Sequence, residues 1–163
     1  MNSSVETILL YTILAGFLSI VYGYFTGKNI LNSSAGNSKM QDIASAIQIG
    51  AKAYLARQYK TISIVGVVVL VIVSIAFSPL VGLGYLIGAS LSGIAGYVGM
   101  LVSVEANVRT AEASKKGLAN GLSVAFKSGA VTGMLVAGLA LLAIAVYYYL
   151  LLKVNVDERE IVN

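Results

Sequence analysis

Residues 80–127 read LVGLGYLIGASLSGIAGYVGMLVSVEANVRTAEASKKGLANGLSVAFK. The first 25 of them, residues 80–104, carry no charge, and a helix needs about 20 apolar residues to cross roughly 30 Å of hydrocarbon. Small residues recur every four positions in this run, which favours close approach of a second membrane helix. These small residues are Gly84, Gly88, Ser92 and Gly96. Residues 105–127 are basic and amphipathic, so we expect a packable membrane helix followed by a basic helix at the membrane surface.

The chain as a whole has the composition of an integral membrane protein. Of its 163 residues, 58% are hydrophobic and only 11% are charged, whereas a soluble domain has about 25% charged residues. Four uncharged runs, at residues 8–25, 61–77, 80–104 and 128–152, are each predicted to cross the bilayer as a helix. We therefore predict an all-α integral membrane fold with four transmembrane helices in a single domain, residues 1–163.

Two long basic amphipathic segments, residues 26–60 and 105–127, connect the spans. The first holds five of the eleven Lys and Arg residues and the second holds four. The positive-inside rule places both segments in the cytoplasm and both termini outside the cell membrane. Within the first segment, residues 27–38 are a predicted polar turn. Residues 40–60 are a predicted amphipathic helix, which either lies at the interface or extends the next span into water.

Few polar residues are candidates for a functional role. No span contains an ionisable side chain, which is the usual mark of an ion pathway. Glu105 is either an ion-entry carboxylate or the partner of Arg109 one helical turn later, and we favour the pair. Residues 57–60 (RQYK) either bind phosphate or lipid head groups or anchor the helix at the interface, and we favour the anchor.

Two further patterns have a functional and a structural interpretation. The stripe from Gly84 to Gly96 could line a pore, but helix packing is the favoured interpretation. The acidic cluster Asp157, Glu158 and Glu160 could bind a divalent ion, but we favour a solvated tail. The chain lacks Cys and His, so a metal site would use oxygen ligands and prefer Mg²⁺ or Ca²⁺ over zinc.

The sequence contains no recognisable motif for catalysis. A Gly-rich phosphate loop, a nucleophile–base pair and a nucleic-acid-binding surface are all absent from the 163 residues. We therefore assign no catalytic, cofactor-binding or metal-binding residue, and we expect the lipid bilayer, not a nucleic acid, as a partner.

Two stretches resemble a known family. MQDIASAIQIGAKAYLARQYKTI (residues 40–62) resembles the first cytoplasmic loop of the membrane-integral, ion-pumping inorganic pyrophosphatases. SGIAGYVGMLVSVEANVRTAEASKKGLANGLSVAFKSGAVTGM (residues 92–134) resembles the part of the same family that follows. Its specific features are N-x-R-T-A at residues 107–111, then Gly117-Leu118, and then AFKSGAV at residues 125–131.

The resemblance implies an enzyme of about sixteen membrane helices in two concentric rings. Such an enzyme hydrolyses magnesium pyrophosphate at the cytoplasmic face, pumps H⁺ or Na⁺ outward, and forms homodimers. This chain resembles its N-terminal portion, the first four helices of the outer ring. The loops that hold Mg²⁺ and pyrophosphate in the family have no counterpart here, so we expect the chain to bind no cofactor and to be inactive alone.

Two alternatives remain at this point. A complete four-helix proteolipid, such as a rotor-ring subunit, fits the length and glycine content, but it needs a carboxylate near the middle of the second or fourth span. Residues 65–75 and 133–143 contain none. A scaffold or assembly subunit that keeps only outer helices is the other alternative. The residues do not distinguish it from a fragment of the pump, nor H⁺ from Na⁺, nor potassium dependence from independence.

Overall fold

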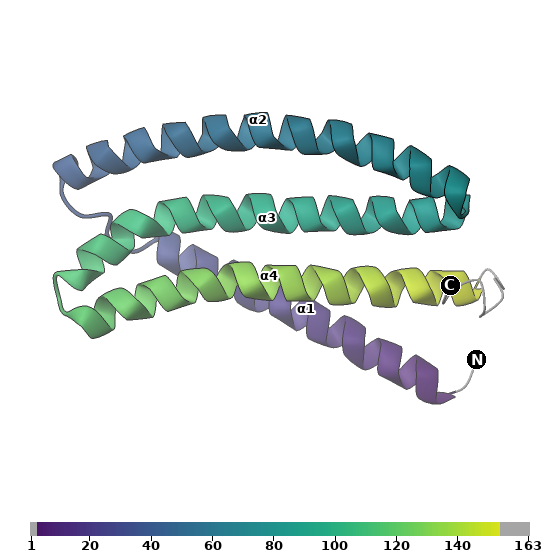
Figure 1. The fold of residues 1–163 in the computed structure, drawn as a ribbon. Helices are drawn as coiled ribbons and strands as arrows, with labels where there is room; N and C mark the ends of the chain where they lie inside the picture. Colours follow the sequence, from purple (N-terminus) through teal and green to yellow (C-terminus); the bar gives the residue numbers. More distant parts are fainter. Residues whose placement is uncertain (1–2, 154–163) are drawn as a thin grey trace.

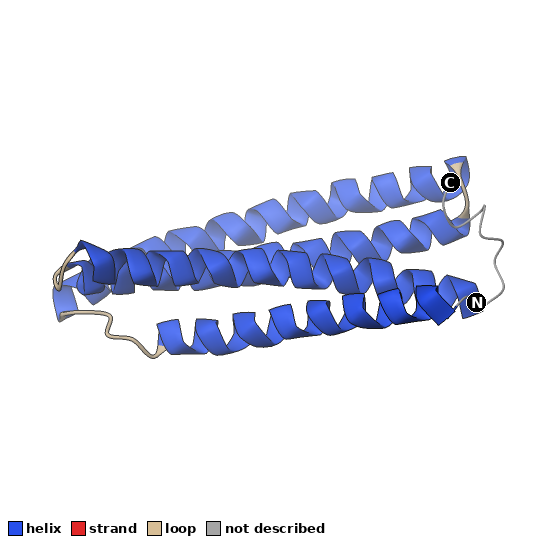
Figure 2. Cartoon of the chain, turned by 90° about the horizontal axis from the view of Figure 1, so that it is seen from below, coloured by secondary structure: helices blue, strands red, loops and turns tan. Residues whose placement is uncertain are grey.

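The computed structural model describes residues 3–153, which form four long helices joined by short turns (Figure 1). The helices are α1 (Ser3–Leu31), α2 (Ser38–Ala76), α3 (Pro79–Ser114) and α4 (Leu118–Lys153). The described residues contain no strand (Figure 2). The all-α prediction is therefore confirmed, and each of the four helices is long and apolar enough to cross a membrane.

The first basic segment is mostly helical. The helix α1 continues to Leu31, so the turn predicted over residues 27–38 is shorter than expected. The amphipathic residues 40–60 and the span that follows form one helix of 39 residues, α2, which is the second of the two arrangements expected. This helix starts where the Asn37 side chain accepts a hydrogen bond of 3.0 Å from the Met40 backbone N–H, an N-cap that satisfies a free donor.

The prediction of a separate surface helix over residues 105–127 is wrong. Residues 105–114 are the last turns of α3, and α4 begins at Leu118. The reason is Gly117, whose φ of +119° is a backbone conformation that side-chain-bearing residues rarely adopt. Its N–H donates to the Ser114 carbonyl at 3.0 Å, which closes α3 and turns the chain back into α4.

The turn between α2 and α3 contains the single proline of the chain, Pro79. The Ser78 hydroxyl accepts a hydrogen bond from the Val81 N–H at 3.2 Å, and Pro79 occupies the first turn of α3, where its missing N–H is not needed. Two residues therefore suffice to reverse the chain, and α2 and α3 lie side by side.

The four helices form an open layer and do not close into a bundle (Figure 1). Their spatial order is α2–α3–α4–α1. The helix α3 packs against α2 and α4, and α1 packs mainly against α4, but α1 and α2 make no contact within the described residues. The most apolar part of α2 contains no buried residue. Hydrocarbon can cover such a surface, whereas exposing it to water costs about 25 cal/mol for each Å².

Glycines set the closest approaches within the layer. A Cβ atom placed on Gly138 would lie 2.8 Å from the Gly16 carbonyl oxygen and 2.9 Å from Ser19 Cβ. One placed on Gly99 would lie 2.6 Å from Thr132 Cγ2. The backbones of α1 and α4 therefore approach each other at a distance that only glycine permits. The same holds for the backbone of α3 and the Thr132 side chain of α4.

A small hydrophobic core lies where three of the helices meet. Ile30 of α1, Ala106 of α3 and Val131 of α4 are its buried members, and Val102, Val124 and Leu135 pack against them. The end of the long uncharged run of α3 is thus buried against other helices.

Candidate functional site at the charged end of the helices

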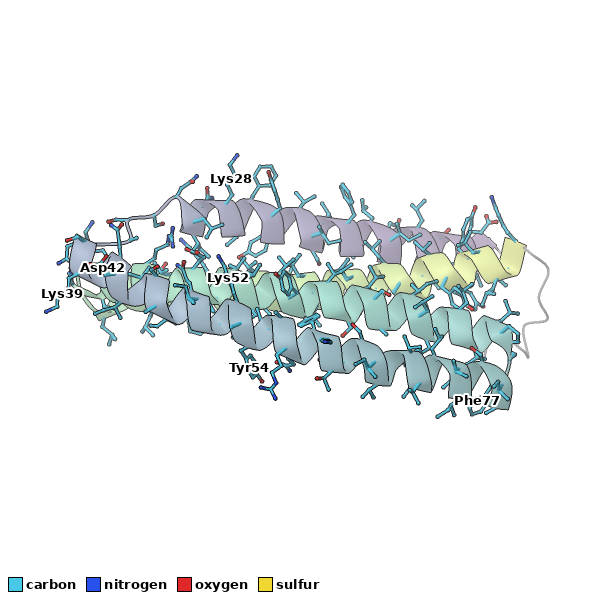
Figure 3. The ribbon with its side chains drawn as sticks, turned by 90° about the horizontal axis from the view of Figure 1, so that it is seen from above. Lys28, Lys39, Asp42, Lys52, Tyr54 and Phe77 are labelled. Atoms are coloured by element: carbon cyan, nitrogen blue, oxygen red, sulfur yellow. The ribbon has the colours of Figure 1, made fainter. Side chains whose placement is uncertain are left out.

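Charged side chains gather at the end of the layer where α1 and α3 finish and α2 and α4 begin. Lys28, Lys39, Asp42 and Lys52 lie toward this end in Figure 3, and Phe77 marks the opposite end. Glu6 and Lys28 are 22 positions apart along α1, or about 33 Å of helix. That length is close to the hydrocarbon thickness of about 30 Å, so the charged end projects beyond the apolar zone.

Glu105 and Arg109 form the ion pair that their spacing predicts. Nη1 of Arg109 lies 3.0 Å from Oε2 of Glu105 and also donates to the Glu105 backbone carbonyl at 2.6 Å. Nε and Nη2 of Arg109 donate to the Leu31 carbonyl at 3.2 and 2.8 Å. That carbonyl belongs to the C-terminal end of α1, so Arg109 satisfies a free acceptor and places positive charge at the negative end of the helix dipole.

A second polar cluster joins the α1–α2 turn to the end of α3. Lys115 Nζ lies 2.5 Å from Glu112 Oε2 and 3.2 Å from Met40 Sδ. Gly36, with φ of +80°, lies directly beside them, because a Cβ atom there would be 2.6 Å from Met40 Sδ and 2.7 Å from Glu112 Oε2. The cluster is filled by its own side chains and holds two chain segments together.

Residues 57–60 divide into two kinds of side chain. The Tyr59 hydroxyl donates to the Gly93 carbonyl at 2.7 Å, and its ring meets the Tyr97 ring edge-on at 5.4 Å between centroids. Tyr59 therefore ties α2 to α3, a role that the sequence did not reveal. Arg57 and Lys60 are exposed and form neither an ion pair nor a side-chain hydrogen bond within the described residues.

The small-residue stripe of α3 is only partly in contact with other helices. A Cβ atom on Gly84 would lie 3.0 Å from the Tyr147 ring, and one on Gly96 would lie 3.1 Å from the Tyr59 hydroxyl. Gly88 has no neighbouring atom within 4 Å of such a Cβ. The stripe thus packs at its two ends and stays open between them.

The described acidic residues do not converge. In residues 3–153 there is no group of three or more His, Cys, Asp or Glu side chains that could hold a metal ion. Glu105 is paired with Arg109, and Glu112 with Lys115 just after the end of α3. The acidic cluster at residues 157–160 lies outside the described residues. The charged end is therefore suited to joining helix ends, and its geometry favours the ion-pair interpretation of Glu105.

Four apolar helices with one basic end define a polytopic α-helical membrane protein. Sequence comparison identifies the family: the chain belongs to the family described as inorganic H⁺ pyrophosphatase, whose family model matches residues 17–163. This confirms the resemblance seen in residues 40–62 and 92–134. The family is an ion-translocating pyrophosphatase, and its members are membrane-embedded enzymes.

Individual relatives are pumps named for two different ions. The K(+)-insensitive pyrophosphate-energized proton pump of Methanosarcina mazei is 43% identical over 147 residues, which cover 89% of this chain and 22% of the relative. A putative K(+)-stimulated pyrophosphate-energized sodium pump of Clostridium tetani is 40% identical over 129 residues, covering 79% and 19%. A similarly named sodium pump of Bacteroides thetaiotaomicron is 37% identical over 153 residues, covering 90% and 21%. The chain spans about a fifth of the length of the curated relatives it matches.

Proposed function

We propose that this chain forms outer-ring helices of a pyrophosphate-energised ion pump and corresponds to the N-terminal portion of that pump. The observation that carries the proposal is the family match over residues 17–163. The pump as a whole would couple hydrolysis of magnesium pyrophosphate to transport of H⁺ or Na⁺. Both ions remain in the proposal, because relatives of similar identity are named for each of them.

The open layer supports a place beside further helices of the same pump. Gly88, Gly129 and Gly133 have no neighbour within 4 Å of an added Cβ atom, so small-residue positions on α3 and α4 are uncovered. Small residues are the positions at which membrane helices pack most closely. The proposed partners are therefore the remaining helices of the pump, a second copy in a homodimer, and the lipid bilayer.

The chemistry of the reaction assigns hydrolysis to other parts of the pump. Magnesium pyrophosphate requires several converging carboxylates for Mg²⁺ and free cations for the phosphates. The described residues do not fit such a site, because Glu105 and Glu112 are paired with Arg109 and Lys115 and lie in separate clusters. We propose that Mg²⁺ and pyrophosphate bind outside these four helices, and that the 163-residue chain alone is inactive.

Two measurements test the proposal. Membranes containing the chain alone should release no phosphate from magnesium pyrophosphate beyond empty membranes. A chimera in which residues 17–163 replace the matching segment of the Methanosarcina mazei pump should retain pyrophosphate-energised proton transport, with the unmodified pump as the control. Hydrolysis by the chain alone would contradict the inactivity. A chimera that inserts with normal helix content but neither hydrolyses nor transports would contradict the assignment to the pump.

A further inference from the structure

Three of the four helices have a cation where their long uncharged run meets the charged end. These cations are Lys28 of α1, Lys60 of α2 and Lys127 of α4. Arg57 lies three positions before Lys60 and adds a second cation to α2. In α3 the first charged residue is Glu105. We call Lys28, Arg57, Lys60 and Lys127 the basic collar.

The basic collar has no counter-ion within reach among the described residues. Its four side chains are exposed and form neither an ion pair nor a side-chain hydrogen bond there. Glu105 is already paired with Arg109 at 3.0 Å. Asp42 lies 15 positions before Arg57, which is about 23 Å along α2. The positive charges of the collar are therefore balanced by something outside the four helices.

The basic collar lies about one hydrocarbon thickness from the opposite end of the helices. Arg57 precedes Phe77 by 20 positions, or about 30 Å of helix. Lys127 precedes Tyr149 by 22 positions, or about 33 Å, and an equal length separates the two charged residues of α1. A hydrocarbon core is about 30 Å thick. The collar therefore stands at the depth of the lipid head groups in one leaflet.

The collar faces away from the layer at both of its edges, which are α1 and α2. The helix α2 contacts only α3, and the Tyr59 hydroxyl, which donates to the Gly93 carbonyl at 2.7 Å, marks the side of α2 that faces α3. Arg57 is about 200° round the helix from Tyr59, and Lys60 is about 60° from Arg57, so both cations lie on the outer side. Lys28 points away from the other helices in Figure 3.

We propose that the basic collar selects anionic phospholipids in the leaflet at the charged end. The head-group phosphates accept hydrogen bonds from the four side chains. Phosphatidylcholine balances its phosphate with a choline cation, whereas an anionic lipid keeps a net negative charge that each basic side chain attracts. At the opposite end the described residues hold one acid, Glu6, and one cation, Lys153, so the selection is confined to one leaflet.

Lipid reaches every part of the collar. The helices α1 and α2 lie at opposite edges of the layer and make no contact within the described residues, so one acidic segment of another polypeptide would cover the cations of one edge only. The surrounding leaflet meets both edges. This selection extends the interfacial anchor expected at residues 57–60, because both use the same cations. It requires only that the helices span a bilayer, so it stands apart from the proposed pump function.

The absence of tryptophan from the chain allows a fluorescent reporter at each edge. Ile64→Trp lies one helical turn from Lys60 on α2, and Phe25→Trp lies three positions before Lys28 on α1; both positions are exposed. Phe77→Trp, exposed at the opposite end of α2, is the control. The full chain is reconstituted in phosphatidylcholine vesicles with phosphatidylglycerol or phosphatidylcholine brominated at the same chain position. Quenching reports the relative binding of the two lipids at each reporter.

We expect phosphatidylglycerol to be preferred about fivefold at both edge reporters, the ratio for one basic side chain at an anionic membrane surface. At Phe77→Trp the two lipids should quench equally. Arg57→Gln combined with Lys60→Gln should abolish the preference at Ile64→Trp. The same double variant should leave the preference at Phe25→Trp unchanged, because Lys28 of α1 is still present.

A matched variant removes the same charge farther from the bilayer. Lys39→Gln combined with Lys116→Gln should leave the preference at Ile64→Trp unchanged. Lys39 lies 18 positions before Arg57, about 27 Å along α2, and Lys116 lies in the α3–α4 turn. At an ionic strength of 0.15 M the Debye length is about 8 Å, so charge at the tip of the layer is screened from the lipid. Circular dichroism confirms equal helix content, and Val68→Trp, exposed on the same face of α2, replaces Ile64→Trp if that variant does not fold.

Four results would overturn the proposal. Equal quenching by the two lipids at both edge reporters would show that the collar does not select an anionic lipid. An equal preference at Phe77→Trp would show a general attraction that is not confined to one leaflet. A preference at one edge only would replace the collar by a contact of that edge. A preference at Ile64→Trp that survives Arg57→Gln with Lys60→Gln would remove the cations on which the proposal rests.

Discussion

Replacing Gly138 by Ala should weaken the packing of α1 on α4. The added Cβ atom would lie 2.8 Å from the Gly16 carbonyl oxygen, 2.9 Å from Ser19 Cβ and 3.3 Å from Ile20 Cγ1. Ordinary contacts of a Cβ atom begin at 3.4 Å. Two of the three neighbours are backbone or Cβ atoms, which cannot turn away, so the helices themselves must move apart by about half an ångström.

The size of the effect follows from two opposing terms. Overpacking of a tight contact costs about 1–3 kcal/mol. Replacing glycine by alanine inside a helix returns up to about 1 kcal/mol through helix propensity. Gly133→Ala on the same helix has the gain in helix propensity without the cost of overpacking, because no atom lies within 4 Å of its added Cβ. The difference between the two variants, about 1–3 kcal/mol, therefore isolates the close contact with α1.

Thermal unfolding followed with a thiol-reactive dye measures this difference. The chain has no cysteine, so Ala145→Cys, at a position only 1% exposed, reports loss of packing as a single reactive thiol. In this background Gly138→Ala should melt about 2–12 °C below Gly133→Ala, at roughly 2–4 °C for each kcal/mol. Identical melting temperatures for the two variants would refute the argument that the α1–α4 contact requires glycine at this position.

Three further predictions concern two contacts and the orientation of the chain in the membrane. Arg109→Lys keeps the charge but loses the two-donor contact with the Leu31 carbonyl, so it should cost about 1–3 kcal/mol and speed proteolysis of the α1–α2 turn; unchanged proteolysis would contradict this. Ser78→Ala removes the N-cap of α3 and should lower stability by about 1 kcal/mol in the same melting assay, whereas Ser78→Asp should not. In intact cells a membrane-impermeant maleimide should label Phe77→Cys at once and Ser34→Cys only after permeabilisation; the opposite pattern would reverse the proposed orientation.

The number of helices could be predicted because the bilayer leaves little choice. An uncharged run of about 20 residues has few alternatives to a spanning helix, since hydrocarbon supplies no partner for free backbone groups. The ends of the helices were harder to predict. The amphipathic pattern of residues 40–60 is the same whether that helix lies on the membrane surface or continues into the span that follows. The break at Gly117 depends on one positive φ angle, which the basic composition around it concealed.

The contacts at the charged end show where sequence reasoning stops. Glu105 and Arg109 could be paired because four positions along a helix bring two side chains together. The second contact of Arg109 is with the backbone carbonyl of Leu31, 78 positions away. A carbonyl group is common to every residue, so no residue type marks it. The hydrogen bond from Tyr59 to the Gly93 carbonyl escaped prediction for the same reason.

The glycines of α3 show why a small-residue pattern does not identify the packing partner. Gly99, outside the predicted stripe, faces the Thr132 side chain at a distance that excludes a Cβ atom, whereas Gly88, inside it, faces open space. Both have the same chemistry, because a missing side chain only permits approach and carries no preference for one neighbour. Gly88 and Ser92 line a hollow beside α4, while Gly93 and Tyr97 line the groove beside α2. The two sides of α3 therefore differ in what lines them. The hollow beside α4 has only small and aliphatic side chains, whereas the groove beside α2 is also lined by Tyr59, Tyr85 and Tyr97.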